Sequence, residues 1–129
     1  MKCLIIAIVV VLPIECWAAD KNGEYRETYP ADHVTCESFL LAENECKHGR
    51  CLDLKTFSDW LMGYITSYNS NTPDTFDIAA KTDLKNSIIW LGNYCKQHPS
   101  NKYSQAAQSL MNELYPIRQK IKPKDWVEK

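Results

Sequence analysis

Three side chains within the short stretch CKHGRC have the types and spacing that could do chemistry. Cys46, His48 and Cys51 are soft or borderline metal ligands, as found at zinc sites. The set offers only three ligands, at a spacing unusual for zinc. The same spacing around Gly49 also suits a local disulfide across a polar turn. The choice depends on whether the chain leaves the reducing cytosol, where disulfides are rare.

The N-terminal stretch MKCLIIAIVVVLPIECWA has the order of a secretory signal: a lysine, a short apolar core and a small residue, Ala18. We predict a signal peptide over residues 1–18 and a mature start at Ala19. The apolar run is short of the roughly 20 residues that a spanning helix needs. Glu15 before Cys16 disfavours a lipid anchor. The sequence therefore predicts a periplasmic or secreted protein with no stable membrane anchor after cleavage.

Signal cleavage removes the first two cysteines and leaves four, an even number that implies disulfides in an exported chain. Three pairings are possible. We favour Cys46 with Cys51 across the turn, and Cys36 with Cys95 between helices, because both of the latter lie on inward, apolar helix faces. An oxidising compartment then leaves no thiolates for zinc, and we expect no bound metal and no cofactor.

The apolar residues of the mature chain recur at spacings of three and four, which predicts helices. Four segments show the pattern, at residues 35–43, about 53–68, 82 or 83 to 98, and about 101–115. Little of the chain alternates with a period of two. We predict one all-α domain over residues 35–116, a disulfide-stapled bundle of about four helices. Residues 19–34 should be irregular, and 117–129 should form a polar tail.

The stretch SYNSNTPDTF predicts a joint between two helical segments. The polar run 69–71 should end one helix, and the threonine, proline and acid that follow are typical of a helix start. Loops on rigid scaffolds often carry recognition residues. We therefore predict that Tyr68, Asn69, Asp74 and Phe76 contribute to a partner-binding surface. The alternative is that they only cap and plug the joint.

Four residues of the second and third expected helices have a predicted packing role: Trp60, Gly63, Tyr64 and Trp90. Tyr64 continues the apolar stripe of its helix, and each tryptophan lies beside such a stripe. A glycine within a helix costs about 1 kcal/mol relative to alanine. We therefore expect another element to approach Gly63 closely, with Trp60 and Trp90 as its neighbours.

Charge and motifs exclude several functions. The formal net charge is −1 and no basic stripe is present, so nucleic acid is not an expected partner. Asp74, Asp77 and Asp83 lack the alternating oxygens and the glycine of a calcium loop. The chain contains no nucleophile elbow, HExxH helix, phosphate loop or dinucleotide-binding glycine pattern. We predict a protein that is not an enzyme.

Several stretches resemble small exported bacterial proteins of the HdeA-like kind: CESFL, WLMGYITSYN, PDTFDI, WLGNYC and HPSNKYSQAAQSLMNELYP. That family includes a periplasmic, helical acid-stress chaperone with one disulfide between distant helices, which Cys36 and Cys95 would match. The GYI stretch and the helix followed by HP are also similar to periplasmic immunity proteins of type VI secretion systems. The second cysteine pair departs from the chaperone pattern.

These observations predict a non-catalytic periplasmic or secreted module that binds another protein, of the immunity or inhibitor type. A homodimer stays open as a further form of association. The first alternative is an acid-stress chaperone, which should expose apolar surface as its carboxylates protonate. A second bridge would restrict that loosening. The second alternative is an enzyme of unknown type.

Overall fold

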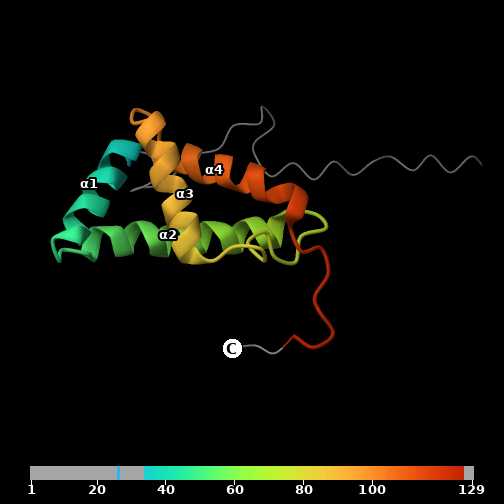
Figure 1. The fold of residues 1–129 in the computed structure, drawn as a ribbon. Helices are drawn as coiled ribbons and strands as arrows, with labels where there is room; N and C mark the ends of the chain where they lie inside the picture. The colour runs from blue at the N-terminus through green and yellow to red at the C-terminus, as the bar shows by residue number, and fades with distance from the viewer. Residues whose placement is uncertain (1–25, 27–33, 127–129) are drawn as a thin grey trace, which may run out of the picture.

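The computed structural model describes Arg26 and residues 34–126, and the predicted signal peptide and mature start lie outside these residues. Four helices follow one another, as Figure 1 shows: α1 (Cys36–Lys47), α2 (Leu52–Asn71), α3 (Leu84–Gln97) and α4 (Tyr103–Leu114). A 3-10 turn, η1 (Tyr115–Ile117), follows α4 directly. The described residues contain no strand, so the predicted all-α bundle is confirmed.

Two of the helices begin at side chains that satisfy free backbone N–H groups. The hydroxyl of Thr35 accepts from the Ser38 backbone N–H at 3.3 Å, and Ser38 Oγ in turn accepts from the Thr35 N–H. Asp83 accepts from the Asn86 N–H at 2.7 Å and caps α3. Such caps contribute about 1 kcal/mol each. The sequence predicted the start of the first helix at residue 35, and the start of the third at residue 82 or 83.

The helices pack around one core in which α1 contacts both α2 and α3, and α3 contacts α4. Figure 1 shows α3 crossing α2 steeply and α1 closing one end of the long α2. Phe39 of α1 lies at the centre, fully buried. Its ring stacks on Tyr103 of α4 at 5.0 Å, and Phe57 of α2 meets both rings edge-on. One aromatic cluster therefore joins three of the helices.

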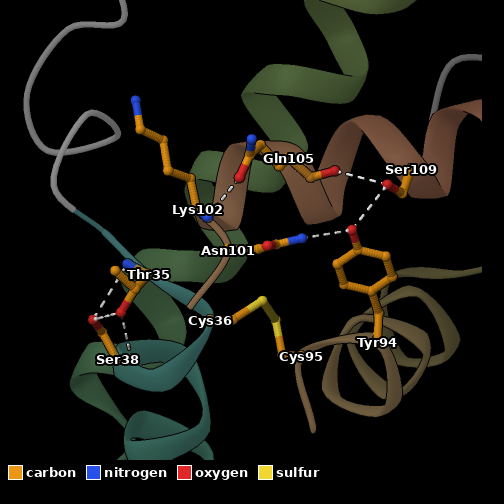
Figure 2. The surroundings of a disulfide bond; sticks show 9 residues. All are labelled: Thr35, Cys36, Ser38, Tyr94, Cys95, Asn101, Lys102, Gln105 and Ser109. Atoms are coloured by element: carbon orange, nitrogen blue, oxygen red, sulfur yellow. Dashed lines mark hydrogen bonds between the residues drawn. A yellow bond between two sulfur atoms is a disulfide. The ribbon is translucent and has the colours of Figure 1, made fainter. Parts of the chain in front are cut away.

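The predicted long disulfide is confirmed, and it joins the start of α1 to the end of α3. Cys36 and Cys95 are fully buried, with their Cα atoms 4.9 Å apart across a separation of 59 residues. Figure 2 shows this bond beside the loop that enters α4. The Cys36 N–H donates to the Asn101 carbonyl at 2.8 Å, and the Tyr103 N–H donates to the Val34 carbonyl at 2.9 Å. Three segments distant in sequence therefore meet at the bond.

The predicted short disulfide is also confirmed. Cys46 and Cys51 close the turn between α1 and α2, with Cα atoms 4.1 Å apart. Gly49 in this turn has a φ of +88°, a conformation that glycine adopts without strain. His48 hydrogen-bonds through Nδ1 to the Asn44 carbonyl at 2.9 Å. The cysteines that could have formed a zinc site are therefore bonded to each other.

Three residues of the predicted packing set attach α4 to the other helices. Trp60 stacks on Tyr64, whose hydroxyl donates to Gln108 of α4 at 2.7 Å. Trp90 of α3 donates through its indole N–H to Glu113 of α4 at 3.0 Å. The Tyr64 hydroxyl and the Trp90 indole N–H thus each have a partner on α4, and the Trp60 ring packs against Tyr103 of α4 at 5.5 Å.

The prediction for Gly63 is wrong. Gly63 is exposed on α2, and among the described residues no atom lies within 4 Å of a Cβ placed there, neither from Trp60 nor from Trp90. The close approach is instead at Gly92 of α3, where a Cβ would stand 2.9 Å from a carboxylate oxygen of Glu43. The buried glycine lies on α3, against α1.

The two disulfides should differ strongly in their effect on stability. The long bridge closes a loop of 59 residues and the short one a loop of 5. By the chain-entropy argument these stabilise the fold by about 4 and about 2 kcal/mol. Cys36→Ser should therefore lower the free energy of unfolding about twice as much as Cys46→Ser in urea denaturation. Equal losses in the two variants would contradict this ranking.

Candidate functional site

The joint after α2 differs from the predicted helix start. The polar run 69–71 belongs to α2, which ends at Asn71. Asp74 has a φ of +53°, in the left-handed region, so residues 72–74 cannot begin a right-handed helix. The segment continues as turns until Asp83 caps α3. The threonine, proline and acid that suggested a helix start form a tight turn instead.

Side chains within α2 and the joint hold this turn in place. Asn69 accepts a hydrogen bond from the Ile78 N–H at 2.8 Å, and Ile78 is fully buried. Asp77 accepts from the Ala79 N–H at 2.9 Å. Tyr68 is half-buried against the core. The joint is therefore an ordered connection between α2 and α3.

The segment after α4 was predicted to be a polar tail, but Arg118 and Gln119 attach its described part to the joint. We call this attachment the clamp. Asp77 and Gln119 exchange backbone hydrogen bonds at 3.0 and 2.9 Å. Arg118 donates through Nε to the Asp74 carbonyl and to Thr75 Oγ1, both at 3.1 Å. Its guanidinium also lies 3.7 Å from the centre of the Tyr115 ring. The clamp is part of the fold.

The four predicted partner-binding residues lie on this joint, but most of their groups have internal partners. Phe76 packs edge-on against Trp126 at 5.2 Å, and Asn69 bonds Ile78. Tyr68 packs on the core, while the Asp74 side chain is exposed. These contacts favour the structural interpretation of the joint. A binding role for the four residues stays a prediction.

A different feature, an apolar pocket between α1, α2 and the start of α4, is the better candidate site. Its volume is about 310 Å³. Carbon atoms form most of its surface, and Asp53 is the one charged residue among those that line it in the described chain. The lining residues are Val34, Ser38, Leu41, Ala42, Asp53, Thr56, Phe57, Trp60, Tyr103 and Ser104.

Helical spacing on two helices builds the walls of the pocket. Ser38, Leu41 and Ala42 lie at i, i+3 and i+4 on α1, so they share one face. Asp53, Thr56, Phe57 and Trp60 do the same on α2. Leu41 is 60% exposed at the pocket. Phe57 and Trp60 also pack against the core of the bundle, so Leu41 is the wall residue whose apolar side chain is left largely exposed.

Tyr103 contributes a buried phenol beside the aromatic residues of the pocket. Its hydroxyl has no hydrogen-bond partner among the described residues. Burial raises the pKa of this phenol above its ordinary value, and the Glu43 carboxylate raises it further. Tyr103 is therefore a neutral residue at physiological pH. The pocket offers shape and apolar surface rather than an ionised acid or base.

The sequence carried one weak signal for this pocket. The pair Leu40 and Leu41 follows Phe39 directly, and a helix cannot direct all three residues to one side. Phe39 is buried, Leu40 packs at the edge of the core and Leu41 is exposed. Periodicity reports which face of a helix is apolar, not whether a hollow forms between two helices.

Two further observations concern only the part of the chain that the structure describes. Nowhere in residues 34–126 do three or more histidine, cysteine, aspartate or glutamate side chains gather as they would around a metal ion. None of the helices there combines the length and apolar character needed to cross a membrane.

Comparison of the whole chain with protein-family models, with curated proteins and with solved structures finds no significant match in any of the three. The candidate site therefore rests on its geometry.

Substituting Asn69 tests whether this side chain holds the joint. Asn69→Ala leaves the N–H of buried Ile78 without its acceptor, and a lost hydrogen bond of this kind costs about 1–3 kcal/mol. Asn71→Ala is the matched control, because Asn71 is exposed and bonds only within α2. Urea denaturation should show a clear loss for Asn69→Ala and a change within about 0.5 kcal/mol for Asn71→Ala.

The buried phenol of Tyr103 makes stability depend on alkaline pH. Because its pKa is raised in the folded state, the unfolded chain loses this proton first, near pH 10, and folding stability then falls as pH rises further. Tyr103→Phe should reduce that fall and raise stability at neutral pH, since it removes an unpaired buried hydroxyl.

Thermal melts between pH 7 and 11 would check this expectation. Tyr115→Phe, which removes an exposed hydroxyl, is the control and should keep the alkaline loss. A Tyr103→Phe protein that is less stable at neutral pH would contradict the assignment of an unpaired hydroxyl.

Proposed function

We propose that the chain is an exported, non-catalytic binding module that recognises another protein through the pocket between α1, α2 and α4. The proposal is based on an apolar pocket of about 310 Å³ whose lining includes the exposed side chain of Leu41. Apolar pockets that receive one anchor side chain are typical of the energetic centre of protein interfaces.

The dimensions and charge of the pocket indicate the chemistry of the partner. A hollow of this size accepts a bulky aliphatic or aromatic side chain with some neighbouring atoms. Asp53 at its wall favours a basic group beside that anchor. The module would therefore bind a protein segment with an apolar anchor next to lysine or arginine.

Two disulfides support both the compartment and the mode of binding. Such bonds persist in exported proteins, in agreement with the signal-like N-terminal stretch. The short bridge holds the ends of α1 and α2 together beside the pocket. A wall held in this way loses less conformational entropy on binding. This arrangement suits a dedicated immunity- or inhibitor-type binder more than a chaperone that must loosen.

Capture of the partner by matched variants tests the proposal. Leu41→Asp places a charge at the apolar pocket and should weaken binding at least tenfold, at unchanged melting temperature because Leu41 is exposed. Ile89→Asp is the control, on α3 and outside the pocket lining, with a side chain that is 50% exposed. Exported proteins from the source cell would be passed over each immobilised variant, and titration calorimetry of the captured protein would give affinity and stoichiometry.

Three outcomes are possible, and they separate the proposed binder from a chaperone. One protein bound stoichiometrically by the wild type and Ile89→Asp, but not by Leu41→Asp, supports the proposal. Equal capture by all three contradicts the pocket as the site. Binding of many unfolded proteins, together with a rise in apolar dye fluorescence from pH 7 to 3, would instead identify an acid-stress chaperone.

A further inference from the structure

The clamped segment after α4 continues into an exposed stretch of mixed apolar and basic character. Residues 120–124 read Lys-Ile-Lys-Pro-Lys, and the Ile121 side chain is 79% exposed. The chain is fixed at Gln119, two residues before Ile121, by its pairing with Asp77. Ile121 is therefore an exposed apolar side chain with a lysine on each side. This is the chemistry that the pocket calls for.

The pocket has the complementary charge. Asp53 lines it, and Glu37 lies one helical turn before Leu41 on the same face of α1. No hydrogen bond or ion pair joins either carboxylate to another described side chain. An apolar hollow flanked by two free carboxylates therefore matches an isoleucine flanked by lysines.

The two surfaces of one chain lie too far apart to meet. The pocket lies at the beginning of α2, between Asp53 and Trp60, whereas Gln119 is paired with Asp77 beyond the other end of that helix. Figure 1 shows α1 and the segment that follows α4 at opposite ends of α2. From Trp60 at the edge of the pocket to its last residue, Asn71, α2 spans about 17 Å. Ile121, two residues past the clamp, reaches only about 7 Å further.

We propose that the pocket of one copy receives Ile121 of a second copy, with Lys120 and Lys122 beside Asp53 and Glu37. If each copy inserts its segment into the other, the contact is reciprocal and closes as a two-fold dimer. The two α2 helices then run antiparallel. This assembly follows from the complementary chemistry of two exposed regions that a single chain cannot bring together.

Gly63 agrees with such a dimer. It lies near the middle of α2, is exposed, and follows Thr56 of the pocket wall by seven residues, so the two share a helix line. A two-fold axis that relates antiparallel α2 helices passes near their midpoints. Glycine there would let the helices approach closely, and no described residue of the same copy comes within 4 Å of a Cβ placed there.

The inference goes beyond the proposed function and does not depend on the identity of the partner protein. The dimer would occupy the pocket in the free protein, and a partner protein would have to displace Ile121 to bind. Self-association would therefore lower the apparent affinity for the partner as the concentration of the protein rises.

Sedimentation equilibrium of the mature protein with its disulfides intact tests the dimer. The wild type should pass from monomer to dimer with rising concentration. Ile121→Asp and Leu41→Asp should each weaken the dimer at least tenfold, and both change exposed side chains that the fold does not need. Ile89→Asp is the control and should dimerise like the wild type. A charge swap sharpens the test: Asp53→Lys with Glu37→Lys should dissociate the dimer, and adding Lys120→Glu and Lys122→Glu should restore it.

The remaining outcomes overturn the proposal. If the wild type is monomeric at every concentration, the pocket does not bind a second copy. Its occupant would then be the partner protein or a segment of the same chain. A dimer weakened by Leu41→Asp but not by Ile121→Asp assigns the pocket to another surface of the second copy. Failure of the proposed function is distinguished by partner capture, because Ile121→Asp should lose self-association and still bind the partner protein.

Discussion

The rest of the structure depends on the buried crossing of α1, α3 and the loop into α4. The Cys36–Cys95 bond fixes the first residue of α1 against the end of α3. Backbone hydrogen bonds from Cys36 to Asn101 and from Tyr103 to Val34 extend the attachment to α4. Figure 2 shows Tyr94 continuing it, with its hydroxyl accepting from Asn101 at 3.0 Å. This crossing places Tyr103, and with it the pocket that α4 completes.

The pocket depends on the two disulfides together, because they hold the two ends of α1. One bond fixes the start of α1 and the other fixes its end against α2. α1 is therefore fixed at its start against α3 and at its end against α2, so it cannot shift freely to fill the space beside α2. Ala42, at the centre of the wall, is too small to fill it. Close packing is the rule in protein interiors, so a hollow held open in this way suits a surface that receives a side chain from outside.

Helix positions and disulfide pairing could be predicted from the sequence because both follow local rules. Apolar spacing defined the helices, and Thr35 and Asp83 began them as expected. The joint could not be predicted, because Asp74 adopts a left-handed conformation. Its carbonyl accepts a hydrogen bond from Arg118, which is 44 residues away in the sequence. The pocket was not predicted, since it depends on the angle between helices. The close approach at Gly92 rather than Gly63 has the same cause.

The distribution of contacts along α2 separates the joint from the pocket as candidate surfaces. At its C-terminal end, Asn69 and the joint find partners inside the protein, including the clamp at Gln119. At its N-terminal end, Phe57 and Trp60 pack against the core and also line the pocket, where Leu41 of α1 is largely exposed. Exposed apolar surface that adjoins a hollow is unfavourable for an isolated protein and is typical of an interaction site. The end of the molecule with Leu41 is therefore the one where binding would add stability that the fold alone does not supply.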